Sequence, residues 1–209
     1  MIEEIGLGLA AAALALPVVI EVAKRPRIQI EPHVWTPQSA VPWTFATVYV
    51  RVAPLPRVAR SMLVRQSAAG ATVTIEFRQN GQLVLPEIAG RWSARREPVE
   101  PEIVTGPSGQ PTVRWKFLPE QVPNSRTLDL APGRWEEVAV AIQRQDGTAS
   151  AFAAESYAHS DWRHQGWDLP RGVYDVTVRV ASSGVSRARD FMLDNLAADF
   201  NRFRLTPTS

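Results

Sequence analysis

The chain contains no cysteine among its 209 residues. Disulfide bonds, thiolate catalysis, iron–sulfur clusters and cysteine-ligated zinc are therefore excluded. Small secreted domains often depend on disulfides, so the absence favours a reducing compartment, although bacterial envelope proteins can also lack cysteine.

An excess of charge of one sign is also missing. The 23 basic and 21 acidic residues give a formal net charge of +2, and only Lys24 and Lys116 are lysines. A nucleic-acid-binding protein usually carries a stronger, clustered positive charge, so no nucleic acid partner is expected. The sequence has no glycine-rich phosphate loop, nucleophile elbow or HExxH helix. We therefore expect no cofactor and favour a function that is not enzymatic.

What the sequence does contain is an apolar N-terminal run with no charge from Ile5 to Ile20. Extended to Ala23 it has about 19 residues and, as a helix, a length of ~28 Å, which is near the minimum for crossing a bilayer core. We expect residues 1–25 to be a single membrane-anchoring helix with its flanks. Its lipid-facing apolar residues would be Ile5, Leu7, Leu9, Leu14, Leu16, Val18, Val19 and Ile20.

The charges beside this run predict its orientation. A secretory signal peptide has a positive segment before the apolar run, whereas here the positive charges Lys24, Arg25 and Arg27 follow it. The positive-inside rule then places the rest of the chain in the cytoplasm. A signal peptide, a helix buried against a partner, and a domain on the outer side of the membrane remain alternatives.

Residues 26–209 show the period-two alternation of β-strands, and no amphipathic helix stands out. The segment 88–111 is expected to be irregular, because it contains Pro98, Pro101, Gly106, Pro107 and Gly109. Asn80-Gly81 predicts a tight hairpin turn. We predict one all-β domain, an antiparallel sandwich of about eight or nine short strands joined by long loops. The expected strands cover residues 28–31, 46–52, 73–77, 83–85, 113–117, 138–142, 174–180, 188–193 and 201–205.

One of these strands resembles a known family. The turn Leu169-Pro170-Arg171-Gly172 leads into Tyr174 and then into valines at positions 176, 178 and 180. This pattern resembles the late strand of bacterial immunoglobulin-like and fibronectin-like sandwiches. The resemblance covers about the last 40 residues. It implies an immunoglobulin-like sandwich in which the Tyr174 hydroxyl donates a hydrogen bond back to the main chain. It implies nothing about an activity.

The strongest candidate site lies in a long aperiodic segment, since loops of this length often carry function. Its polar and aromatic residues are Tyr157, His159, Asp161, Trp162, His164 and Trp167. His159, Asp161 and His164 have suitable ligand atoms for a divalent metal, but their spacing matches no metal motif, so we assign none. The structural alternative is a surface loop held down by its two tryptophans.

Arg91, Arg95 and Arg96 form a local basic cluster. They would contact anionic lipid head groups if the domain lay close to a bilayer. The alternative is that they are solvated and paired with Glu97 and Glu100.

These observations favour a membrane-anchored, non-catalytic interaction or scaffold protein whose partner is another protein. The alternative is an envelope-facing domain that binds or hydrolyses carbohydrate with residues 157–168, because exposed tryptophans can stack on sugar rings. The orientation in the membrane discriminates between the two, since a cytoplasmic domain does not meet envelope polysaccharide.

Overall fold

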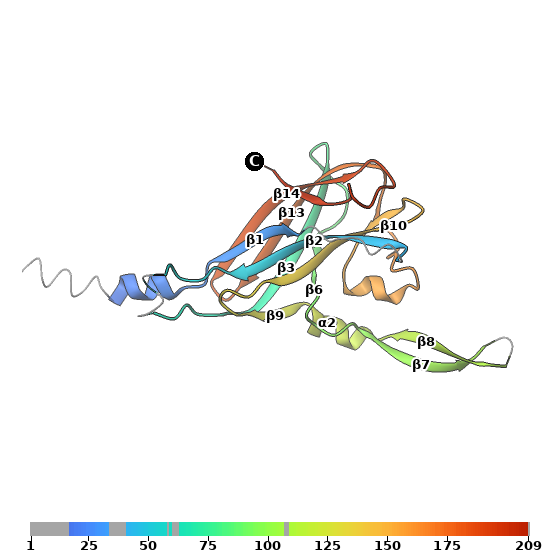
Figure 1. The fold of residues 1–209 in the computed structure, drawn as a ribbon, viewed down its shortest axis with the longest axis horizontal. Helices are drawn as coiled ribbons and strands as arrows, with labels where there is room; N and C mark the ends of the chain where they lie inside the picture. Colours follow the sequence, from blue (N-terminus) through green and yellow to red (C-terminus); the bar gives the residue numbers. More distant parts are fainter. Residues whose placement is uncertain (1–16, 34–40, 58, 60–62, 107–108, 209) are drawn as a thin grey trace, which may run out of the picture.

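The computed structural model describes residues 17–33, 41–57, 59, 63–106 and 109–208. These residues contain fifteen strands and three short helical turns, in addition to a helix over residues 17–24. The strands form two open antiparallel sheets and a separate two-stranded hairpin (Figure 1). The prediction of an all-β chain is thus confirmed.

The first sheet has the strand order β1-β2-β10-β11-β12, and β6 pairs with β10. Every pairing in it is antiparallel. Its strands are β1 (Ile28–His33), β2 (Trp43–Val52), β6 (Arg91–Trp92), β10 (Glu136–Arg144), β11 (Ala149–Ala151) and β12 (Asp168–Leu169).

The second sheet has the order β15-β14-β13-β3-β4, and β5 and β9 both pair with β3. Its long strands β13 and β14 are paired residue by residue from Gly172↔Asn195 to Ser182↔Val185. Its strands are β3 (Ala68–Gln79), β4 (Gln82–Leu83), β5 (Ile88–Ala89), β9 (Thr127–Leu130), β13 (Gly172–Ser182), β14 (Val185–Asn195) and β15 (Leu205–Pro207).

The two sheets share one hydrophobic core. Val48 and Val50 of the first sheet and Val176 and Val178 of the second belong to the same buried cluster. Trp92 is fully buried in it, and its indole N–H donates a 3.0 Å hydrogen bond to a main-chain carbonyl of β3. The inward faces of both sheets are therefore structural, which leaves the outer faces and the loops for function.

Most of the predicted strands are present. The best predicted one is β13, whose residues Tyr174, Val176, Val178 and Val180 are all buried on one face. The predicted turn at Asn80-Gly81 joins β3 to β4, and both residues have positive φ, 52° and 76°, as a type I′ turn requires.

Two predictions about strand content were wrong. Residues 88–111 were expected to be irregular, but they form β5, β6 and β7 (Val99–Thr105) and begin β8 (Pro111–Phe117). β7 pairs only with β8, so Pro101 occupies a strand with a free edge, where its missing N–H costs no ladder hydrogen bond. The count of eight or nine strands was also too low, because several strands of only two residues were not recognised.

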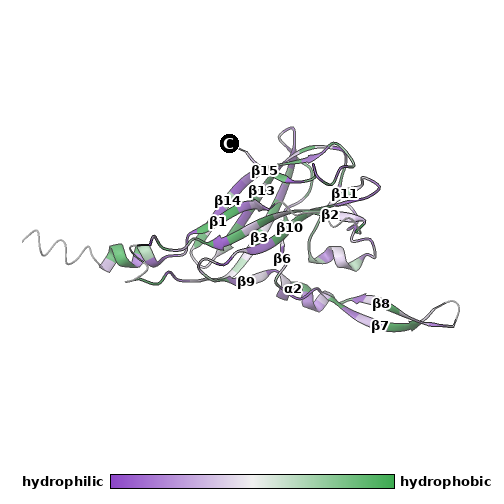
Figure 2. Ribbon diagram, in the orientation of Figure 1, coloured by the Kyte–Doolittle hydropathy of each residue, from purple (hydrophilic) through white to green (hydrophobic). Residues whose placement is uncertain are grey.

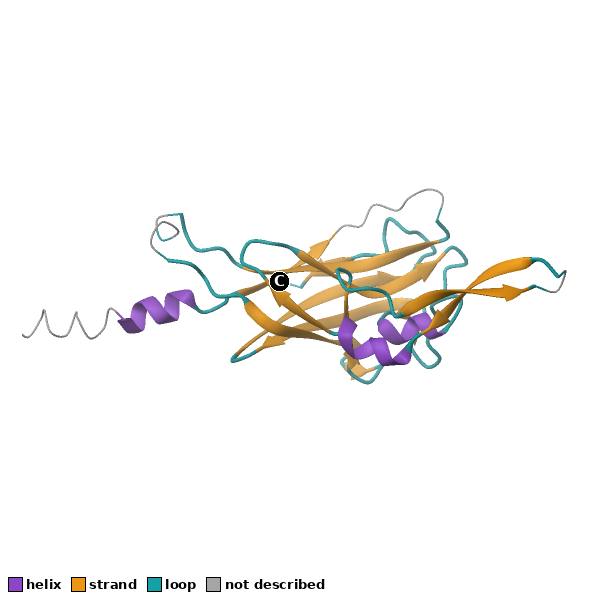
Figure 3. Cartoon of the chain, turned by 90° about the horizontal axis from the view of Figure 1, so that it is seen from below, coloured by secondary structure: helices purple, strands orange, loops and turns teal. Residues whose placement is uncertain are grey.

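The β7–β8 hairpin projects from one end of the molecule and the N-terminal helix from the other (Figures 1 and 3). Three short helical turns lie near the base of the hairpin (Figure 1). They are η1 (Pro119–Gln121), α2 (Val122–Ser125) and η2 (Ala154–Ala158).

Residues 17–24 are helical, and the helix is followed directly by the approach to β1. Val18 and Val19 are exposed, Ile20 and Lys24 are half-buried, and Arg25 and Arg27 are exposed. Among the described residues, no helix is both long and apolar enough to cross a membrane. The other predicted anchor residues lie outside the described residues; they are Ile5, Leu7, Leu9, Leu14 and Leu16.

Candidate functional site

The outer face of the first sheet carries a row of three residues from three strands. Thr47 of β2 and Arg91 of β6 are both paired with Ala139 of β10, so the three side chains stand next to one another. The small alanine in the middle leaves a depression between its larger neighbours. This depression is the floor of a pocket.

An aromatic cluster stands beside this row. A β-bulge between Ala139 and Ala141 lets Ile142 face outward, where it is paired with Phe45. Ile142, Ala139 and Phe152 form a second, smaller hydrophobic cluster on this face. The aromatic rings packed against it are Trp43, Phe45, Tyr157 and Trp162.

Trp162 is central to the cluster. Its ring lies edge-on to Trp43 at 4.7 Å between centroids and 6.0 Å from Tyr157. Its backbone φ is +56°, a left-handed conformation that bulky side chains seldom adopt. Backbone strain of this kind is concentrated at functional sites.

Hydrogen bonds from Arg144 of β10 connect the turn that carries Trp162 to the first sheet. The Nε and Nη2 atoms of Arg144 donate hydrogen bonds of 3.0 and 2.8 Å to the main-chain carbonyl of Asp161. The N–H of Trp162 donates to the carbonyl of His159 at 3.0 Å and closes the turn. Burial lowers the pKa of the Arg144 guanidinium. The segment 157–162 is therefore fixed to the sheet and is not a loose loop.

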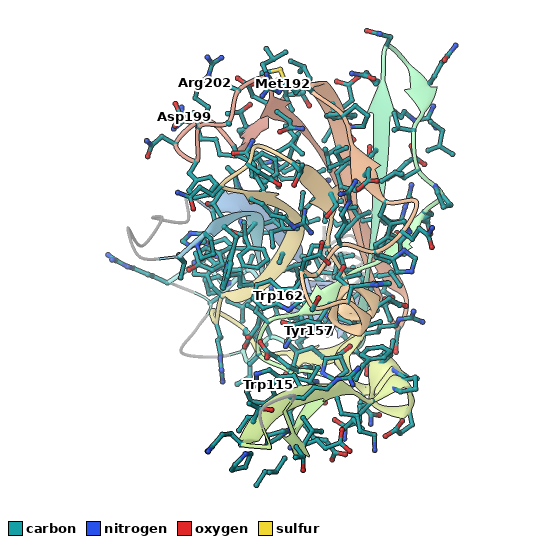
Figure 4. The ribbon with its side chains drawn as sticks, turned by 90° about the vertical axis from the view of Figure 1, so that its right-hand side faces the viewer. Trp115, Tyr157, Trp162, Met192, Asp199 and Arg202 are labelled. Atoms are coloured by element: carbon teal, nitrogen blue, oxygen red, sulfur yellow. The ribbon has the colours of Figure 1, made fainter. Side chains whose placement is uncertain are left out.

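Three open pockets surround Trp162, which lines all of them. The Trp43 pocket, of about 630 Å³, lies between Trp43 and Asp161. The Arg91 pocket, of about 410 Å³, lies over Ala139. The hairpin groove, of about 600 Å³, lies between the η2 segment and β8. Figure 4 shows Trp162, Tyr157 and Trp115 one below another on this side of the molecule.

Tyr157 separates two of these pockets. Its hydroxyl donates a 2.9 Å hydrogen bond to the Glu97 carboxylate, and its ring lies 5.2 Å from the Arg91 guanidinium. Burial raises the pKa of the Tyr157 phenol; the Arg91 charge opposes the shift, and the Glu97 carboxylate adds to it. The phenol therefore stays protonated at neutral pH and acts as a hydrogen-bond donor.

The structure brings together only part of the site predicted from the sequence. Tyr157, His159 and Trp162 line the hairpin groove, and Asp161 lines the Trp43 pocket. His164 instead stacks on Trp167, with 4.0 Å between ring centroids.

Trp167 itself packs against the main core. The two histidine rings, of His159 and His164, are 5.8 Å apart at their centroids. In the described part of the chain, no three side chains of His, Cys, Asp or Glu are grouped so that they could hold a metal ion.

The hairpin carries a second feature that the sequence did not predict as a site. Ile103 and Val113 stand directly opposite each other, as do Pro101 and Trp115. Ile103 is 77% exposed, Val113 64% and Trp115 65%. The expected strand over 113–117 is present, but its alternating apolar residues Val113 and Trp115 face solvent instead of a core. Figure 2 shows that both strands of the hairpin carry hydrophobic as well as hydrophilic stretches.

Comparison with family models, curated proteins and solved structures finds no match to this chain, so its function has to be argued from the geometry of these sites.

Proposed function

We propose that the chain is a membrane-anchored, non-catalytic interaction module that binds another protein through the apolar face of the β7–β8 hairpin. The observation that carries the proposal is the exposure of Ile103, Val113 and Trp115 on one face of this hairpin. An isolated two-stranded hairpin is only marginally stable in water, and a contiguous exposed apolar face is typical of a surface that binds a partner.

The other face of the hairpin supports this interpretation. It carries Glu100, Glu102, Arg114 and Lys116, and an ion pair of 3.6 Å joins Lys116 to Glu100. The hairpin is thus amphipathic, with a charged side that suits solvent and an apolar side that has no cover in the described structure. A protein segment laid along the apolar side would complete it.

The position of the hairpin favours a protein over a lipid as its partner. The hairpin and the N-terminal helix project from opposite ends of the molecule (Figure 3). A bilayer that held the helix would therefore lie far from Trp115. The apolar residues of the hairpin would then meet proteins in the aqueous phase.

The proposed anchor is supported by the described part of the N-terminal helix. Val18, Val19 and Val22 are exposed on it although they are apolar. We propose that the apolar residues before them continue into the bilayer, with the β domain on the cytoplasmic side next to Lys24, Arg25 and Arg27. Membrane fractionation with carbonate extraction tests the anchor, and reporters fused after the last residue test the side of the membrane.

The hydrogen bond of Tyr174 supports an immunoglobulin-like sandwich. Its hydroxyl donates to the main-chain carbonyl of Pro170, four residues upstream, in the manner of a tyrosine corner.

A photoreactive amino acid placed at position 103 or 115 tests the binding role in living cells. We expect both positions to crosslink to the same protein, and the same residue at position 179, on the outer face of the second sheet, to crosslink to nothing. Equal crosslinking from position 179, or none from the hairpin, would argue against the proposal.

The carbohydrate alternative is favoured by the Trp43 pocket. It combines two indole rings, Trp43 and Trp162, with the polar groups of Arg144, Asp146 and Asp161. Aromatic faces with nearby hydrogen-bonding groups are what a sugar-binding or sugar-hydrolysing site uses. Two results together would support this alternative over the first. The domain would lie on the outer side of the membrane, and it would bind neutral oligosaccharides that the Trp43→Ala variant does not bind.

A further inference from the structure

The Arg91 pocket contains a buried cation that has no carboxylate partner among the described residues. Arg91 is only 5% exposed, yet no carboxylate of the described residues lies within 4.0 Å of its guanidinium. One nitrogen, Nη2, donates to the main-chain carbonyl of Arg95 at 2.7 Å, while the buried Nε donates to nothing in the described structure. Buried charges are costly unless they are paired, so this arrangement indicates a missing anionic group.

A second polar group faces the same pocket without a partner. Thr47 is 1% exposed, and its Oγ1 atom has no hydrogen-bond partner among the described residues. It stands across Ala139 from Arg91. Two buried donors on opposite sides of one small floor residue form a site that a ligand with acceptor atoms would complete.

The charges around the pocket favour an anion. Arg95 and Arg96 line it together with Arg91, and two carboxylates, Glu97 and Glu137, line it as well. The three arginines leave one positive charge in excess. The Glu97 carboxylate accepts the Tyr157 hydroxyl and forms no ion pair with Arg91 within 4.0 Å.

The apolar residues that line the pocket indicate which chemical group the anion is attached to. Phe45, Phe152 and Trp162 add apolar surface to the lining of the same pocket. The volume of about 410 Å³ fits a small ligand or the end of a chain. A guanidinium edge binds a planar carboxylate with two parallel hydrogen bonds.

We propose that the Arg91 pocket binds a carboxylate attached to an apolar or aromatic group. The carboxylate would accept hydrogen bonds from Arg91 Nε and Thr47 Oγ1, and the apolar group would lie against Phe45 and Phe152. Two sources have this chemistry: a free small acid, and the C-terminal carboxylate of a polypeptide that ends in an apolar residue. The pocket is separate from the exposed face of the hairpin, so this site does not depend on the proposed role of that face.

Calorimetric titration of the full chain in neutral detergent tests the site with two pairs of probes. The first pair is 3-phenylpropionate and its amide; the second is a short peptide ending in phenylalanine with a free or an amidated C-terminus. We expect the charged member of at least one pair to bind at least about tenfold more tightly than its amide, because a charge-assisted hydrogen bond is lost in the amide.

The outcomes separate the sources. Preference for the free acid identifies a small-molecule site, and preference for the free peptide terminus identifies the end of a partner chain. Equal binding of acid and amide in both pairs, or inorganic phosphate binding as tightly as the carboxylates, would overturn the proposal.

Three variants test the residues assigned to the site. Arg91→Gln and Ala139→Leu should each weaken carboxylate binding at least about tenfold. The first removes the guanidinium that donates two parallel hydrogen bonds, and the second fills the space over residue 139. Thr47→Val keeps the shape of the side chain and removes only the hydroxyl. It should weaken binding without lowering the melting temperature, which keeps the test valid if either of the others fails to fold.

Arg179→Gln is the matched control, because Arg179 is an exposed arginine on β13 of the other sheet. It should bind the carboxylates as the unmodified chain does. Unchanged binding in folded Arg91→Gln or folded Thr47→Val, or an equal loss in Arg179→Gln, would overturn the assignment.

Discussion

Ile103 and Val113 stand directly opposite each other across the β7–β8 hairpin, and both side chains are exposed to solvent. In a sandwich, apolar side chains that face each other across a strand pair normally lie over a core. Here they lie at the end of an arm that extends beyond both sheets. Their contribution to the stability of the isolated chain is therefore small, and their shape and hydrophobicity matter for contacts made with another molecule.

Replacing Val113 by threonine should change the unfolding free energy by no more than about 0.5 kcal/mol, because an exposed side chain loses little packing and threonine favours strands equally well. The same substitution at Val178, which is fully buried, should cost about 1–3 kcal/mol for the buried hydroxyl. Urea denaturation measures both. A loss at position 113 as large as that at position 178 would mean that the hairpin packs on the domain.

Replacing Tyr174 by phenylalanine should cost about 1 kcal/mol, since the hydroxyl loses its hydrogen bond to Pro170. The carbonyl of Pro170 also accepts a 3.1 Å hydrogen bond from the Asn195 side chain, so it keeps a partner in the variant. Thermal and urea unfolding check the value. A loss near zero would leave the turn at residues 169–172 without its proposed tyrosine corner.

Alkaline pH should destabilise the fold through its buried phenols. Burial raises the pKa values of Tyr157 and Tyr174 above the ordinary value of 10.0. As pH rises through about 10, the unfolded chain loses these protons first, so the stability present below that pH is lost by up to about 1.4 kcal/mol per pH unit for each tyrosine. The stability of Tyr157→Phe, measured from pH 8 to 11, should fall less steeply than that of the unmodified chain. An identical slope would contradict the burial of this phenol.

The strands that sequence alone predicts well are those with a long, unbroken alternation. In β13, Tyr174, Val176, Val178 and Val180 alternate with polar residues over most of the strand, and only one face can be buried. Asn80-Gly81 was equally informative, because few residue pairs adopt positive φ at two successive positions.

Period-two alternation predicts the wrong face for residues that follow a β-bulge. The alternation of Val138, Val140 and Ile142 predicts one shared face, but the bulge after Ala139 sends Ile142 to the outer face. An extra residue in a strand cannot be recognised from the hydrophobic pattern. The sequence therefore did not predict that Ile142 joins Phe152 in a cluster on the outer face.

The pocket floor could not be predicted either, because it depends on register. Thr47, Arg91 and Ala139 are 44 and 48 residues apart along the chain. Nothing local shows that β6, β10 and β2 lie side by side in this alignment. The sequence identified Arg91 as a member of a surface basic cluster, whereas the structure buries it.

The last prediction concerns the strained backbone at Trp162. Both Trp162→Gly and Trp162→Ala remove the indole ring and lose the same contacts with Trp43 and Tyr157. They differ only in the Cβ atom. At φ +56° that atom is unfavourable by about 1–2 kcal/mol, whereas at ordinary positions glycine is the less stable of the two by roughly 0.5–1 kcal/mol. We therefore expect Trp162→Gly to be more stable than Trp162→Ala by about 1 kcal/mol in urea denaturation. The same pair at Tyr157, whose φ is not positive, is the control and should show the opposite order. If alanine were the more stable residue at both positions, the left-handed turn at Trp162 would not be a strained element held in place by its ring.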